Sequence, residues 1–211
     1  MASRMKTILC FGDSNSWGYI PGTEMERFSR AQRWPGILAN ALAGKIELIE
    51  ENLCGRTTAF DDPLFPDRNG AKHLPMLLDS HLPIDGLVIM LGTNDLKHYL
   101  QLAPTDIALG VGFLVDQARM RLPGLPVLVV CPPPTVEASA PFGHKFDQSM
   151  ETSIGLPEAY LEIAEEKGCL FFDAGTVAEA SPIDGVHLAA ASHQRLGDAL
   201  AVPIMQLADY S

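Results

Sequence analysis

The sequence predicts an α/β fold: a three-layer α/β/α sandwich around a five-stranded parallel sheet. Four short runs are apolar without alternation, which suits strands that helices cover on both faces. Between these runs the apolar residues change to helical spacing, and the alternation continues to the end of the chain. Because parallel strands need crossovers of a dozen or more residues, the helices would supply the connections.

Five segments are the expected strands. Four of them are the unbroken apolar runs at residues 8–11, 87–91, 127–131 and 170–172. The fifth, residues 46–50, alternates apolar and acidic residues and is typical of a strand at the edge of a sheet.

The helices are predicted from apolar residues that recur every three or four positions. In the first of them Pro35 is tolerated near the first turn, and Gly44 marks the end. The apolar stripes occupy residues 34–42, 71–78, 107–118, 160–164 and 196–207.

Three irregular stretches interrupt this alternation, at residues 19–31, 58–69 and 132–153. In a doubly wound sheet, ligands bind at the carboxyl ends of the strands. Each stretch follows a strand or a strand-to-helix turn, so we expect all three to wall the functional face. No repeat, low-complexity tract or linker divides the chain, which predicts a single domain over residues 1–211.

Charge and hydropathy exclude several classes of partner. The 15 Lys and Arg residues stand against 26 Asp and Glu residues, a formal charge of −11. Such a chain repels a phosphate backbone or an anionic membrane, so we expect neither nucleic acid nor membrane as a partner. No run reaches 18 apolar residues, and the apolar stretch near the N-terminus is too short for a signal peptide. A cytoplasmic location is therefore predicted.

Cysteine and histidine spacing gives no sign of a metal site. Cys10, Cys54, Cys131 and Cys169 are isolated, without a C-x-x-C pair, and we expect free thiols, three of them in or beside apolar runs. The histidines form no H-x-H or H-x-x-x-H pair. The sequence therefore predicts no metal.

The first strand leads into Gly-Asp-Ser-Asn-Ser at residues 12–16. A serine at this point, Ser14, would present both its hydroxyl and its own backbone N–H at the carboxyl edge of the sheet. By itself the segment is equally typical of a turn.

Two further segments could supply hydrogen-bond donors at the same edge. The strand at residues 87–91 leads into Gly-Thr-Asn-Asp, where the neutral amide of Asn94 could donate to a developing oxyanion. The edge strand leads into a turn with Gly55, where the backbone could approach a substrate oxygen closely. Taken alone, Asn94 could instead cap a turn and Gly55 could be an ordinary turn glycine.

Residues 184–187 read Asp-Gly-Val-His before the last helical stripe. On a tight loop, Asp184 could hold the ring nitrogen of His187 that faces away from a serine, which fixes the tautomer and stabilises an imidazolium. The competing interpretation is a helix-entry aspartate with a packed histidine.

Together these blocks resemble the GDSL or SGNH serine hydrolases, which carry G-D-S, a glycine block, G-x-N-D and D-x-x-H in this order. The match spans nearly the whole chain. The resemblance implies the flavodoxin-like SGNH hydrolase fold with Ser14 as the nucleophile, His187 as the general base and Asp184 as its orienting acid. It also implies an oxyanion hole made by the backbone amides of Ser14 and Gly55 and the side chain of Asn94.

Several neighbouring stretches are similar to the bacterial arylesterase and acyltransferase branch of that family. They are residues 11–14, 17–18, 33–34, 55–58, 61–62 and 89–95. The expected substrate is then a short-chain acetyl or aryl ester, with acyl transfer to an alcohol or to peroxide as a further activity, no cofactor, and a homo-oligomeric assembly.

Asn15, Trp17 and Thr93 are the residues expected to contact the substrate. Asn15 stands where the family usually has leucine, which we expect to alter substrate shape more than activity.

Other functions would use the same sheet edge. Within the family, the alternatives are a carbohydrate acetylesterase and a thioesterase. A metal-dependent phosphoesterase could use Asp13, Asn94, Asp95 and His187 but would be marked by paired histidines, which the sequence lacks. A flavin-binding module would need a phosphate-cradling loop after the first strand, where Asp13 would repel the phosphate.

Overall fold

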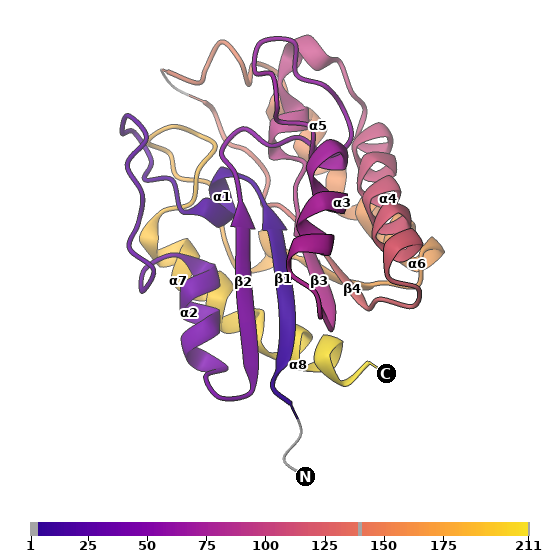
Figure 1. Ribbon diagram of the computed structural model, residues 1–211. Coiled ribbons are helices and arrows are strands. Elements are labelled where there is room, and N and C mark those ends of the chain that lie inside the picture. Colours follow the sequence, from indigo (N-terminus) through magenta and orange to yellow (C-terminus); the bar gives the residue numbers. More distant parts are fainter. Residues whose placement is uncertain (1–3, 139–140, 211) are drawn as a thin grey trace.

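A parallel sheet of five strands runs through the computed structural model, which describes residues 4–138 and 141–210 (Figure 1). Its strands lie in the order β2-β1-β3-β4-β5. Their bounds are β1 Lys6–Gly12, β2 Ile46–Asn52, β3 Gly86–Met90, β4 Val127–Cys131 and β5 Leu170–Asp173. All five strands predicted from the sequence are confirmed, and all of them pair in parallel.

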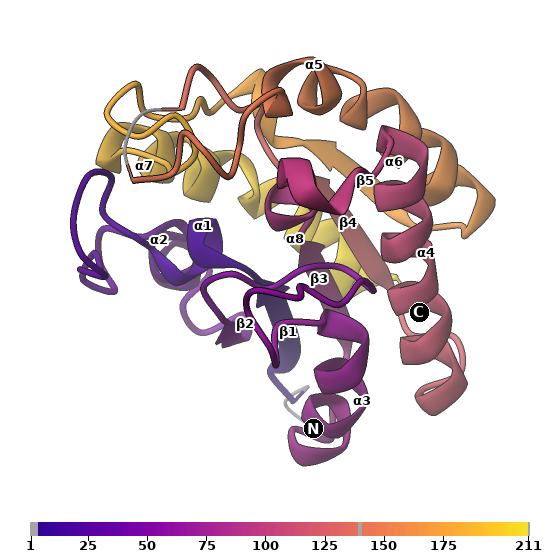
Figure 2. The same ribbon diagram turned by 90° about the horizontal axis from the view of Figure 1, so that it is seen from above.

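Helices cover both faces of the sheet and make the three predicted layers (Figure 2). One core lies between the sheet and helices α2 Trp34–Ala41, α7 Ala190–Ala199 and α8 Ala201–Asp209. The other lies between the sheet and helices α3 Gly70–Ser80, α4 Pro104–Arg121 and α6 Leu156–Glu166. Burial on both faces explains why the central strands are apolar throughout.

The register of the central strands brings three chain segments to one edge. Gly12 at the end of β1 pairs with Asn52 at the end of β2 and with Met90 at the end of β3. The segments that follow these strands therefore begin side by side, although they lie about 40 residues apart in sequence. This edge is where the functional blocks of the sequence meet.

The strand at the far edge differs from the sequence expectation. The run at residues 170–172 is apolar without alternation, which predicts a strand covered on both faces, yet every residue of β5 is only half-buried. The reason is its position, because β5 pairs only with β4 and has an open side. The sheet thus has two partly exposed edges, β2 and β5.

The C-terminal helical stripe also differs from expectation. It predicts one helix over residues 196–207, whereas the chain forms α7 and α8 with a break at Leu200. Pro203 explains the break, since a proline lacks the N–H that a continuous helix would need there and is tolerated in a first turn.

Short helical turns occupy parts of the irregular stretches. They are α1 Ser14–Trp17, α5 Ser149–Ile154 and three 3₁₀ turns, Thr93–Leu96, His98–Leu100 and Ala174–Thr176. Within residues 4–138 and 141–210, no helix is both long and apolar enough to cross a membrane.

All four cysteines are free. Cys10 and Cys131 are buried in the sheet, as their apolar context predicts, and Cys169 is half-buried. Cys54 lies in the loop after β2 and is also half-buried.

Gly92 sets the direction in which the chain leaves β3. Its φ of +120° lies in a region that side chains with a Cβ rarely adopt. The Tyr160 hydroxyl donates a hydrogen bond of 2.7 Å to the carbonyl of Leu91, and a Cβ at Gly92 would overlap that hydroxyl. This contact fixes the start of the 3₁₀ turn Thr93–Leu96 against α6.

We predict that Gly92→Ala lowers the free energy of unfolding by about 3 kcal/mol, because overlap with Tyr160 adds to backbone strain. Adding Tyr160→Phe removes the overlap, so the double variant should be less destabilised than the sum of the two single variants. Urea denaturation of the four proteins measures this coupling. Additive effects would show that the hydroxyl does not restrict Gly92.

Candidate active site

Ser14 occupies the first position of α1, directly after β1. Asp13 caps this helix, because its Oδ1 accepts a hydrogen bond of 2.9 Å from the backbone N–H of Asn15. The side chain of Ser14 is nearly buried, with 4% of its surface exposed. Its backbone N–H belongs to the first turn, where a helix has no internal acceptor for it.

Ser14, His187 and Asp184 form one chain of hydrogen bonds. The Oγ of Ser14 lies 3.0 Å from Nε2 of His187, and Nδ1 of the same ring lies 2.8 Å from Oδ2 of Asp184. With the proton on Nδ1 donated to Asp184, Nε2 is free to accept from the serine hydroxyl. Such an arrangement can transfer the hydroxyl proton to the ring as the oxygen attacks an electrophilic carbon.

The carboxylate of Asp184 also organises its own turn. Its Oδ1 accepts the backbone N–H groups of Val186 and His187 at 3.1 and 3.0 Å, and its Oδ2 accepts that of Gly22 at 3.3 Å. Burial acts to raise the pKa of Asp184, but the hydrogen bonds from His187 and Val186 outweigh it and the pKa lies below its ordinary value. Asp184 is therefore held as a carboxylate.

Two aromatic rings fix the plane of the imidazole. The ring of Tyr19 stacks on His187 with centroids 4.1 Å apart and an interplanar angle of 21°. Phe142 meets the same imidazole edge-on at 5.1 Å. Sequence reasoning did not single out either residue, although both lie in the irregular stretches expected to wall the site.

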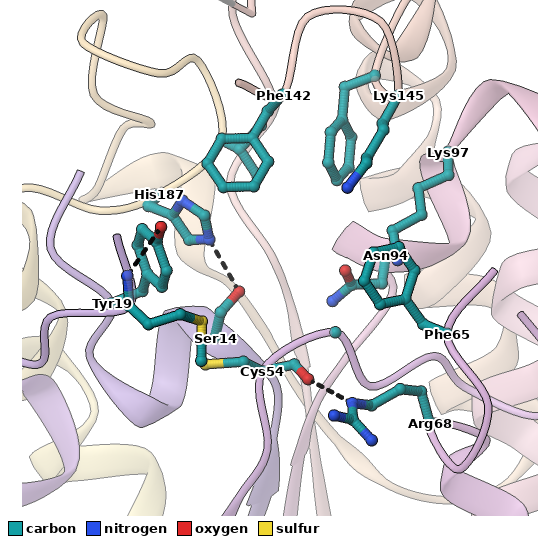
Figure 3. A pocket seen from close by; sticks show the side chains of 14 residues that line it. Ser14, Tyr19, Cys54, Phe65, Arg68, Asn94, Lys97, Phe142, Lys145 and His187 are labelled. Atoms are coloured by element: carbon teal, nitrogen blue, oxygen red, sulfur yellow. Dashed lines mark hydrogen bonds between the residues drawn. The ribbon is translucent and has the colours of Figure 1, made fainter. Parts of the chain in front are cut away.

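Asn94 lies across the cavity from His187 (Figure 3), and Gly55 lines the same cavity. The amide of Asn94 donates one N–H to the carbonyl of Arg56 at 3.1 Å, which leaves its second N–H available. Gly55 adopts a φ of +83°, and its N–H has no hydrogen-bond partner among the described residues. The structure thus brings four of the five sequence-predicted residues, Ser14, Gly55, Asn94 and His187, to the wall of one cavity. The fifth, Asp184, is buried behind His187 and contacts its ring.

Buried charged groups beneath the cavity hold these loops together. Arg56 donates to the carbonyls of Gly12 and Glu51 and lies 4.0 Å above the Phe11 ring, which joins the Gly55 loop to the end of β1. Asp95 accepts the backbone N–H and hydroxyl of Thr58, which joins the loop to the turn of Asn94.

The cavity has a volume of about 310 Å³, and each of the three irregular stretches contributes to its walls. Tyr19 and Met25 come from the first stretch, residues 65 and 68 from the second, and residues 142, 145 and 146 from the third. The full lining consists of Ser14, Tyr19, Met25, Cys54, Gly55, Phe65, Arg68, Asn94, Lys97, Phe142, Lys145, Phe146, Val186 and His187.

The three residues expected to contact the substrate do not line this cavity. Asn15 is buried and uses its amide to bond the backbone on both sides of His187, donating to the Val186 carbonyl at 3.2 Å and accepting from the Leu188 N–H at 3.0 Å. Trp17 lies against Arg27, whose guanidinium sits 4.7 Å from the indole centroid. Thr93, the first residue of the 3₁₀ turn, is buried, with 2% of its surface exposed. The corrected role of Asn15 is to position the histidine loop.

Lys97, which follows the Asn94 turn, does reach the cavity. Its Nζ lies 2.7 Å from Oδ2 of Asp62, and the Tyr99 hydroxyl also donates to this carboxylate at 3.1 Å. The side chains of Lys97 and Asp62 are 4% and 0% exposed, so the pair is buried. Tyr99 supports the wall from behind without lining it.

Among residues 4–138 and 141–210, no group of three His, Cys, Asp or Glu side chains could hold a metal ion. The residues named for a phosphoesterase have other partners: Asp13 caps α1, Asp95 binds Thr58, and His187 contacts Ser14.

We predict that Asn15→Leu destabilises the histidine loop. The change leaves the buried Val186 carbonyl and Leu188 N–H without partners, which should lower the free energy of unfolding by about 3 kcal/mol. Urea denaturation measures the loss. Asn40→Leu is the matched control, because Asn40 is exposed on α2 and should tolerate the same change. Equal stabilities for the two variants would contradict a bridging role for Asn15.

Asp95 should make the protein less stable as the pH rises. Burial raises the pKa of Asp95 to about 7, although hydrogen bonds from Thr58 act in the opposite direction. Between about pH 4 and pH 7 the folded state then keeps a proton that the unfolded chain has released. The free energy of unfolding therefore falls by about 4 kcal/mol as the pH rises through this range.

Asp95→Asn replaces the titrating carboxyl group with a neutral amide. We predict that the free energy of unfolding of this variant falls less between pH 4 and pH 7 than that of the wild type. Urea denaturation across that range measures it. Part of the loss should persist, because burial also raises the pKa of Asp13, to about 6. A variant with the wild-type pH dependence would show that Asp95 does not carry the effect.

Comparisons with known proteins identify the family of the chain. Residues 10–195 match the model of the GDSL-like lipase/acylhydrolase family. An aryl esterase from M. Smegmatis, solved with an inhibitor, is 42% identical to the chain with a TM-score of 0.92, over 96% of this chain and 99% of that one. Est24, a carbohydrate acetylesterase from Sinorhizobium meliloti, is 41% identical with a TM-score of 0.92 over the same shares.

A more distant structure, TesA, has a TM-score of 0.67 at 22% identity over 96% of this chain and 99% of that one, and shows the same fold. No curated protein gives a significant sequence match. The family model covers most of the chain, and the arylesterase and acetylesterase structures cover nearly all of it, which confirms the SGNH fold. The chain therefore belongs to the GDSL-like lipase/acylhydrolase family and is a carboxylic ester hydrolase.

Proposed function

We propose that this protein is a serine esterase that hydrolyses short-chain acetyl and aryl esters through an acyl intermediate on Ser14. The observation that carries the proposal is the pair of hydrogen bonds, 3.0 and 2.8 Å long, that joins Ser14 to His187 and His187 to Asp184 in the cavity. We assign Ser14 as the nucleophile, His187 as the general base and Asp184 as the acid that orients the ring.

In the first half of the reaction the Oγ of Ser14 bonds to the ester carbonyl carbon and its proton passes to Nε2 of His187. The bond from this carbon to the alcohol oxygen then breaks, and His187 returns the proton to the departing alcohol. In the second half, water attacks the acyl-serine in the same way and releases the acid. Asp184 stays ionised and stabilises the imidazolium in both halves.

The oxyanion that forms on the carbonyl needs donors that are already in place. We assign this role to the N–H groups of Ser14 and Gly55 and to the amide of Asn94. None of them brings a charge, and their positions are fixed by the α1 turn, by the loop after β2 and by the bond from Asn94 to Arg56. Each such donor is worth about 3–4 kcal/mol of transition-state stabilisation.

The cavity and the relatives support a small ester as the substrate. Aromatic side chains from residues 19, 65, 142 and 146 supply much of its wall, which suits an apolar or aryl group. Two similar structures are an aryl esterase and a carbohydrate acetylesterase. An alcohol that reaches the acyl-serine before water would accept the acyl group and form an ester, and hydrogen peroxide would form a peracid, so acyl transfer and perhydrolysis belong to the same proposal. Homo-oligomer formation and a cytoplasmic location stay predictions.

Labelling with a fluorophosphonate, followed by peptide mapping, tests the proposal. We predict that the label attaches to Ser14, and that Ser14→Ala abolishes labelling and lowers kcat by about six orders of magnitude. Phenyl acetate and a series of acetyl to octanoyl esters serve as substrates, and the shorter acyl chains should be preferred.

Ser16→Ala is the matched control, since Ser16 lies on the same short helix but outside the cavity. It should keep the labelling and the turnover. Attachment of the label to a different residue, or turnover that survives Ser14→Ala, would refute the mechanism. A preference for long acyl chains would refute only the substrate class.

A further inference from the structure

The charge of the cavity is opposite to that of the chain. The sequence contains 26 Asp and Glu residues and 15 Lys and Arg residues. Of the described residues that line the cavity, however, three are Lys or Arg and none is Asp or Glu. The basic residues are Arg68, Lys97 and Lys145. With a formal charge of −11, the chain as a whole repels anions, so any anion bound here must be attracted by these local groups.

Two of the three cations have no acidic partner among the described residues. Lys97 is neutralised by Asp62 at 2.7 Å. Arg68 donates only to backbone carbonyls, from Nε to Cys54 at 2.9 Å and from Nη1 to Asp67 and Pro66 at 3.0 and 3.4 Å, which leaves Nη2 unused. The Nζ of Lys145 forms no hydrogen bond or ion pair with a described residue. The cavity therefore holds surplus positive charge.

The cations gather on the wall opposite the imidazole. In Figure 3 Lys145 and Lys97 lie beside Phe65, Arg68 lies lower on the same side next to Cys54, and His187 and Tyr19 lie across the cavity. The Nζ atoms of Lys145 and Lys97 lie 4.5 and 4.8 Å from the Phe65 ring centroid. Arg68, Lys145 and Phe65 are half-buried, so an anion beside either cation is partly shielded from water and interacts more strongly than at an open surface.

We propose that the preferred substrate is an acetyl ester whose alcohol half is aromatic or planar and carries a negative charge, a carboxylate for example, attracted by the surplus positive charge of Arg68 and Lys145. This inference rests on the proposed function, because an acetyl group attached to Ser14 is neutral and leaves the charge to the alcohol half. The ring of that half packs among the aromatic side chains, and its anion offsets the positive charge that Arg68 and Lys145 leave unpaired in the cavity.

Binding of benzoate and benzamide to the wild-type enzyme tests the charge preference without relying on catalysis. The two ligands have similar shape and differ in charge. By isothermal titration calorimetry we expect benzoate to bind at least about tenfold more tightly, a difference of about 1.4 kcal/mol. The double variant Arg68→Gln, Lys145→Gln should lose this advantage. Equal affinity of the wild type for both ligands would overturn the proposal, whether or not the protein is an esterase.

Turnover of 4-acetoxybenzoate and 4-acetoxybenzamide tests the same preference during catalysis. Each kcat/KM is divided by the rate of alkaline hydrolysis of the same ester, which corrects for the leaving group. The wild type should favour the anionic ester by about tenfold or more, and the double variant should bring the ratio close to one. Equal losses on both esters would show that the cations act on the reacting carbonyl instead, which also overturns the proposal.

Lys45→Gln is the matched control, because Lys45 is exposed between α2 and β2 and lies outside the cavity. It should keep the wild-type ratios in both experiments. If neither ester is hydrolysed while benzoate still binds preferentially, the proposed function fails and the anion site stands.

Discussion

The buried carboxylate of Asp184 is the constraint on which the site depends. It accepts hydrogen bonds from four N–H groups, three of the backbone and one of the imidazole. These bonds fold residues 184–187 into a turn, orient His187, and tie the Gly22 loop to the turn. A charge buried at this depth is tolerated only because it is so fully bonded. The orientation of the imidazole and the shape of the loops around it therefore share one origin.

A second set of contacts links the parallel strands to the reacting groups. The ends of β1, β2 and β3 are in register, so the sheet sets the spacing between the Ser14, Gly55 and Asn94 segments before any side chain is considered. Arg56 and Asp95 then lock these segments to one another from below. A rigid sheet edge with cross-linked loops places the hydrogen-bond donors without requiring them to move as charge develops, which is the condition for strong oxyanion stabilisation.

Much of this architecture could be predicted from the sequence, because the signals are local. Apolar runs gave the strands, helical spacing gave the helices, and the serine, asparagine and histidine blocks gave the residues that meet in the cavity. What could not be predicted depends on contacts between distant segments. The local pattern of residues 170–172 does not reveal that β5 lies at an edge, and nothing in the sequence around Tyr19 indicates that it stacks on His187. Asn15 is an example. Its position next to Ser14 predicted a contact with substrate, whereas its side chain bonds to Val186 and Leu188, more than 170 residues away in sequence.

The walls of the cavity come from three separate connections, and none of them contributes a strand to the sheet. The chain can therefore exchange residues in these walls without altering a strand of the sheet. Differences in substrate selectivity are expected to lie in these connections, and the connections are coupled, because Tyr19 of the first contacts Phe142 of the third and Lys145 of the third contacts Phe65 of the second. A change in substrate selectivity can then arise within these connections while the parallel sheet that they join stays as it is.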